Sequence, residues 1–114
     1  MKKSPIAVAE ELRHQAQAAH EAELRRALQP LAQAFRGWER GELRTSALTE
    51  LMRQFREREL QDLELRYQNS QLSMPVAYAI ATGVLDRASV SPELLEHLAG
   101  ALEFYASEPL NGST

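Results

Sequence analysis

The stretch QNSQLSMPVAYAIATGVL, from Gln68 to Leu85, contains no charged residue, although 25% of the 114 residues in the chain are charged. Pro75 suits the first turn of a helix, where the amide that proline lacks would have no partner inside the helix. Gly83 suits the position just past the end, because glycine adopts the left-handed conformation without steric cost. The residues between them are apolar on nearly every side, which is typical of a helix buried all round. The sequence therefore predicts a short buried helix over Met74 to Thr82.

Length and composition indicate one soluble domain. A chain of 114 residues with 44% hydrophobic content is ordinary for a single globular domain. It has no cysteine, which excludes a disulfide framework and a thiolate metal site. The apolar run is shorter than the ~20 residues of a membrane span, and Glu10 and Glu11 interrupt any signal peptide. We expect a cytoplasmic protein without membrane association, with one domain over residues 1–108 and a flexible tail over residues 109–114.

Two long amphipathic helices are expected before the apolar run. Ser4 and Pro5 are typical of a helix start, with serine as the N-cap. The apolar stripe of the first helix has alternating spacings of four and three, at Leu24, Leu28, Leu31, Phe35 and Trp38. Pro30 lies off this stripe, so we expect a kink there and an end at the turn that Gly37 and Gly41 bracket.

The second long helix is expected to run from a cap at Thr45 or Ser46 to about Asn69. Its apolar stripe has two parts, which are Leu48, Leu51, Met52 and Phe55, and then Leu60, Leu63 and Tyr67. At about 100° per residue, the second part is rotated from the first by roughly one-fifth of a turn. The helix must therefore bend or change partners near Glu57. Joined by a short turn, the two long helices form an antiparallel hairpin.

The last helix is expected to start at Ser91, as N-cap, and Pro92, as first helical residue. Leucines continue along one side as far as Tyr105, and Glu108 and Pro109 mark the end. The predicted fold is all-α, a small bundle of about four helices. These are two long antiparallel helices, a short buried helix and an amphipathic C-terminal helix.

A metal-binding helical bundle is one functional alternative, because Glu11 and His14 have the Glu-x-x-His spacing of carboxylate-bridged di-iron bundles. Such sites need a second pair of this kind, which the sequence lacks. His20 and Glu23 have the reversed spacing on the same helix. These residues are therefore expected to be solvated surface groups, and we predict no metal and no cofactor.

The sequence favours a non-enzymatic protein. Asp62 and Arg66 are four residues apart and are expected to form a surface ion pair, with Glu59 at the edge of the same stripe. It stays open whether Glu59, Asp62, Arg66 or His97 is more than a surface residue. An enzyme remains an option only if one cavity brings Glu59, His97 or Tyr78 together.

DNA binding is a second alternative. The stretch SPELLEHLAGAL, Ser91 to Leu102, is similar to the last helix of helix-turn-helix domains of the phage-repressor type, and this resemblance implies a DNA-binding regulator. The charge distribution disfavours it, since residues 68–114 carry a net charge of −4. Acidic residues also interleave with the arginines of residues 36–58. Nucleic acid is therefore an unlikely partner.

Protein interaction is the function that the sequence favours. The first helix begins with an alanine-rich side that is too lean to hold a core by itself and can pack closely against a partner. The arginine-rich turn after it contains Trp38, a residue type that often anchors interfaces. We expect a helical interaction or regulatory module whose partner is another protein or a second copy in a homodimer. The candidate contact surface is Ala9, Ala16, Ala19, Arg36, Trp38, Arg40 and Arg44.

Overall fold

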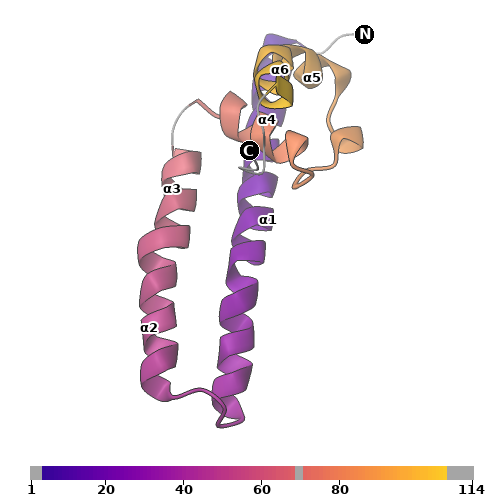
Figure 1. Ribbon diagram of the computed structural model, residues 1–114. Coiled ribbons are helices and arrows are strands. Elements are labelled where there is room, and N and C mark those ends of the chain that lie inside the picture. The colour runs from indigo at the N-terminus through magenta and orange to yellow at the C-terminus, as the bar shows by residue number, and fades with distance from the viewer. Residues whose placement is uncertain (1–3, 69–70, 108–114) are drawn as a thin grey trace.

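The computed structural model describes residues 4–68 and 71–107, and all regular structure in these two ranges is helical (Figure 1). This confirms the predicted all-α class. Within the described residues, none of the helices combines the length and the apolar character that crossing a bilayer requires. The predicted tail, residues 109–114, lies outside the described residues.

The first helix, α1, spans Pro5–Glu39 without interruption at Pro30. Its start agrees with the sequence prediction, because the Ser4 hydroxyl accepts a hydrogen bond from the Ala7 amide at 3.1 Å. The helix ends where the glycines predict a turn. Gly41 has a positive φ of 78°, which glycine adopts without strain, and the Glu42 amide donates to the Gly37 carbonyl at 2.8 Å.

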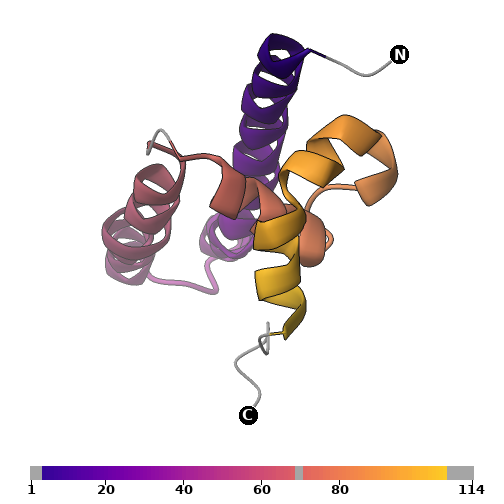
Figure 2. The same cartoon turned by 90° about the horizontal axis from the view of Figure 1, so that it is seen from above.

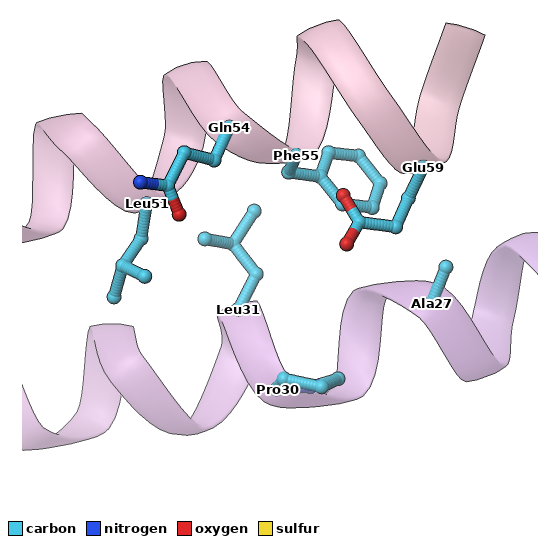
Figure 3. Close-up of a pocket in the computed structure, with 7 residues that line it drawn as sticks. All are labelled: Ala27, Pro30, Leu31, Leu51, Gln54, Phe55 and Glu59. Carbon is cyan, nitrogen blue, oxygen red and sulfur yellow. The ribbon is translucent and has the colours of Figure 1, made fainter. Parts of the chain in front are cut away.

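The second helical rod runs antiparallel to α1 and has three parts (Figures 1 and 3). These are α2 (Thr45–Phe55), the π-helical turn η1 (Arg56–Leu60) and α3 (Gln61–Gln68). The π turn lies at the predicted bend near Glu57. The predicted cap is wrong, because α2 already starts at Thr45 and its N-cap residue, Arg44, makes no side-chain capping bond. The Thr45 hydroxyl instead accepts a hydrogen bond from the Trp38 indole at 2.9 Å.

The short apolar helix, α4, spans Ser73–Ala81 and lies in the core, as the sequence predicts. Val76, Ala77 and Ala79 are completely inaccessible to solvent. The helix packs against α1 and against α6, so α4 joins the two halves of the chain. Gly83, with a φ of 81°, turns the chain after α4, as predicted.

The expectation of one continuous C-terminal helix is wrong. After the 3-10 turn η2 (Arg87–Ser89), the chain forms α5 (Pro92–His97) and α6 (Ala99–Ser107), separated at Leu98. The predicted cap is present, since the Ser91 hydroxyl accepts from the Leu94 amide at 3.1 Å. Leu98 leaves the helical conformation with φ −91° and ψ 3° and is 1% exposed. The bend buries Leu98 and turns α6 against α4 (Figure 2).

The molecule is elongated. Its radius of gyration is 17.5 Å and its extents are 59 × 33 × 24 Å, whereas a compact chain of this length has a radius of gyration of roughly 13 Å. The elements α4, α5 and α6 gather around one end of α1 (Figure 1). The rest of α1 projects from this globular end with α2 and η1 beside it. We call residues 24–60 the arm.

Candidate functional site

Large apolar residues of the arm are half-exposed, although they lie on the stripes that the sequence predicts. Leu28 is 39% exposed, and Leu51 and Met52 are 41% and 43% exposed. Of the described residues 24–60, Leu48 alone is fully buried. Two paired helices bury only the strips that face each other, and their flanks need a third layer. The arm therefore has two open sides, which we name after Leu51 and Met52.

The Leu51 side contains a small pocket of about 130 Å³ between α1 and the second rod (Figure 3). Leu31 points from α1 into the space between Leu51 and Phe55. Pro30 lies in α1 at the edge of the pocket, and Glu59 of η1 flanks Phe55 at the other edge. The pocket is thus a shallow gap in helix packing, with its single carboxylate at the rim.

The Met52 side carries a larger groove, of about 760 Å³. Its apolar lining consists of Leu31, Met52, Phe55 and Leu60, and its charged rim of Arg53, Arg56 and Glu57. Ala27 and Pro30 of α1 line the pocket on the Leu51 side. At about 100° per residue, Leu28 lies on the other side of Leu31 from these two residues, and so on the Met52 side of the arm. This side therefore combines an apolar floor with a rim of both charges, as protein interfaces do.

The rim charges are largely paired within the arm. Arg53 donates to Glu57 at 2.9 Å and forms a second ion pair with Glu50. These pairs raise the pKa of the Arg53 guanidinium and, at Glu50, lower the pKa of the carboxyl group. Arginines and carboxylates alternate along α2 and η1, so this side has no extended surface of one charge.

The tip of the arm holds four of the residues predicted for the contact surface. Trp38 is 40% exposed, makes an edge contact with Phe35 at 6.5 Å between ring centroids and donates to Thr45. Arg40 forms two hydrogen bonds to Glu42, at 3.0 and 3.1 Å. Arg36 and Arg44 are exposed. The tip is thus accessible, with the indole held in a fixed orientation.

The predicted alanine surface needs correction, because Ala16 and Ala19 face the interior. They are 5% and 0% exposed, and they belong to the core cluster that α4 and α5 complete. Their small side chains let the backbones of α1 and α4 approach closely, so the lean side of α1 is used within the chain. Ala9 is exposed and lines a groove of about 470 Å³ with Glu93 and His97 of α5.

A polar cluster fixes the base of the arm, which the sequence did not predict. Arg66 donates to Glu23 of α1 at 2.7 Å instead of pairing with Asp62. The Tyr67 hydroxyl also donates to Glu23. Burial and this hydrogen bond raise the pKa of Tyr67 well above its usual value. His20 stacks on Tyr67, with ring centroids 5.1 Å apart.

The acidic candidates Glu59 and Asp62 line a cleft of about 360 Å³ with Arg66 and Tyr78. This places Glu59 and Tyr78 together, while His97 belongs to the separate groove beside Ala9. Glu59 and Asp62 are exposed to solvent. General acid–base catalysis uses a carboxylate drawn into an apolar pocket, and these two remain in contact with water.

The Glu11 and His14 pair also has a structural explanation. Glu11 accepts hydrogen bonds from the amide and the hydroxyl of Ser91, at 2.9 Å for the amide, and so attaches α5 to α1. His14 is exposed. Within residues 4–68 and 71–107, no three His, Asp or Glu side chains gather closely enough to share a metal ion.

The stretch that is similar to the last helix of helix-turn-helix domains, Ser91 to Leu102, is divided between α5 and α6. Leu94 and Leu98 are buried. Its apolar pattern therefore serves the core.

Comparisons with known protein families, characterised proteins and solved structures found no match for this chain.

Proposed function

We propose that this protein is a non-enzymatic helical interaction module that binds a protein partner through the arm. The observation that supports the proposal is the set of half-exposed side chains on a projecting rod: Leu28, Trp38, Leu51 and Met52 are each 39–43% exposed. Folding within the chain leaves these side chains partly uncovered on the two open sides and the tip of the arm, and exposed apolar surface is costly in water. A partner that covers them gains this hydrophobic free energy.

In this proposal, the carboxylates of Glu23 and Glu11 hold parts of the fold together and take no part in catalysis. Glu23 is engaged by Arg66 and Tyr67, and Glu11 by Ser91. The surface of the arm is apolar with alternating charges, which suits a protein partner better than a polyanion.

The proposal is tested with a photo-crosslinking amino acid placed at Met52, in the cells that produce the protein. The control position is Leu65, which lies on α3 outside the arm and is 61% exposed. We expect a defined adduct from position 52, identified by mass spectrometry, and none from position 65. A second placement at Trp38 tests the tip. The absence of protein adducts from both arm positions would refute the proposal.

A further inference from the structure

We infer that the occupant of the Met52 side is a second copy of this chain, so that two arms pack face to face as a four-helix bundle. This inference rests on the proposed function and names the partner. Its starting point is that the arm lacks a closed core. Leu48 is its one fully buried residue among those described, while Leu28 and Met52 remain about two-fifths exposed. A pair of helices gains most of its stability from tertiary packing, and a second pair supplies the missing layer.

The dimensions of the arm match those of a stable interface. From Leu24 to Trp38 the stripe covers 15 residues, which is about 22 Å of helix, and two helices side by side are roughly 20 Å wide. The flat area of this face, its length times its width, is then roughly 440 Å². Its solvent-accessible area is larger because side chains project from it, and so rises toward the ~800 Å² per partner of standard interfaces. Pairing of two arms therefore approaches the lower end of the range of specific association.

The chemistry of the groove favours an identical partner. Its floor of Leu31, Met52 and Phe55 needs apolar helical side chains, and another arm presents such a stripe at equal length. Arg53 is already paired with Glu50 and Glu57, so the rim needs no highly charged partner. Two-fold symmetry places the same patch on both sides of a contact, and a patch with an apolar floor and both charges at its rim is compatible with itself.

The experiment is sedimentation equilibrium of the full chain at micromolar and higher concentrations. We expect the mass to rise to twice the 12.8 kDa of one chain. Leu28→Glu and Met52→Glu would each place two carboxylates in the dimer interface, so we expect self-association to weaken by roughly 100-fold or more. Leu65→Glu, the same kind of change at an exposed position outside the arm, is expected to dimerise like the wild type.

Circular dichroism and thermal unfolding at low concentration show whether each variant folds. If a glutamate variant loses helix, Met52→Gln replaces it, because glutamine has similar helix propensity and is expected to weaken the dimer by about tenfold. A wild-type chain that stays monomeric would overturn the inference. So would a dimer that survives both glutamate changes, since it would use another surface.

The crosslinking result separates this inference from the proposed function. Adducts between two copies at position 52 support both. A monomeric chain whose position 52 crosslinks to a different protein refutes the second copy and leaves the interaction module standing. A monomeric chain without adducts at either arm position refutes both.

Discussion

Single polar residues connect parts of the chain that are distant in sequence. Arg66 lies 43 positions from Glu23, and the Ser91 amide 80 positions from Glu11. Helical spacing reveals only neighbours on the same helix, which is why the sequence predicted a pair between Asp62 and Arg66. Contacts between helices depend on their tertiary packing and were not readable from the pattern.

The contact between Tyr67 and Glu23 gives a pH-dependent prediction. The pKa of Tyr67 is raised in the folded protein, so folding favours the neutral phenol. The neutral phenol therefore makes its full contribution to the free energy of unfolding below the unfolded-state pKa of about 10. This contribution is lost as the pH rises above that value. We expect Tyr67→Phe to lower the free energy of unfolding by about 1 kcal/mol at neutral pH, because it removes the hydrogen bond to Glu23.

Urea unfolding from neutral to alkaline pH measures this difference. The difference in the free energy of unfolding between wild type and Tyr67→Phe is expected to narrow above pH ~10, where ionisation of Tyr67 begins to destabilise the wild type. A gap that stays constant through this range would contradict the assigned role of Tyr67.

Small residues in the core give a second prediction. Ala79 is fully buried between α1 and the C-terminal helices, so Ala79→Asp places an unpaired carboxylate in the interior. We expect a loss of about 4 kcal/mol or more, enough to remove cooperative thermal unfolding. Ala18→Asp changes the same residue type at an exposed position of α1 and should stay within about 1 kcal/mol of wild type.

The same change at Ala81 should have an intermediate effect, because this residue is only partly buried. This refines the expectation from sequence, which treats all alanines of the apolar run alike. If Ala79→Asp melted like Ala18→Asp, the assignment of α4 to the core would be wrong.

Among the helices, boundaries marked by local chemistry were predictable and boundaries set by packing were not. Serine and proline at positions 4 and 5, and again at 91 and 92, mark the starts of α1 and α5, and Gly41 marks the turn after α1. The bend at Leu98 carried no such mark. Leu94, Leu98 and Leu102 are spaced by four, and the amides of Leu98 and Leu102 still donate to carbonyls four residues earlier.

The π turn explains the rotated stripe of the second rod. A π turn contains one residue more than an α turn between hydrogen-bonded partners. One additional residue corresponds to about 100° of helix, and the turn at 56–60 absorbs this offset. Leu63 and Tyr67 thereby face α1, as Phe55 of α2 does. The sequence predicted the position of this change but not its form.

Deletion of Arg58, an exposed residue of η1, tests this explanation. It should convert the π turn into an ordinary α turn and keep the two parts of the stripe aligned. We expect the melting midpoint to remain within about 3 °C of wild type.

The matched control is deletion of Glu64, which lies in the regular helix α3. It turns Tyr67 by about 100° relative to Leu63 and separates it from Glu23. We expect a loss of roughly 2 kcal/mol, or about 8–15 °C in the melting midpoint. Equal effects of the two deletions would show that η1 does not compensate for an additional residue.

At the scale of the whole molecule, nearly all of the buried core lies at one end of the chain, and the arm has almost none. The packed end contains Ala19, Val76 and Leu94, all completely inaccessible to solvent, whereas Leu48 is the most buried residue of the arm. The sequence predicted both the buried helix and the hairpin. It did not predict how they combine, because the stripe of an amphipathic helix is the same whether a neighbouring helix, a partner or nothing covers it. The predicted surface accordingly included Ala16 and Ala19 and omitted Leu28 and Met52.

This division predicts unequal local stability, which amide hydrogen exchange can measure. At concentrations low enough to keep the chain monomeric, the amides of residues 49–55 in the arm should exchange at least about tenfold faster than those of residues 76–80 in α4. The reason is that opening the arm exposes little buried apolar surface. Raising the protein concentration should slow exchange in the arm and leave α4 unchanged, because self-association protects only the residues that it covers. Equal exchange of the two segments in the monomer would mean that the arm is as stable as the core, and would remove the physical reason for a partner to cover it.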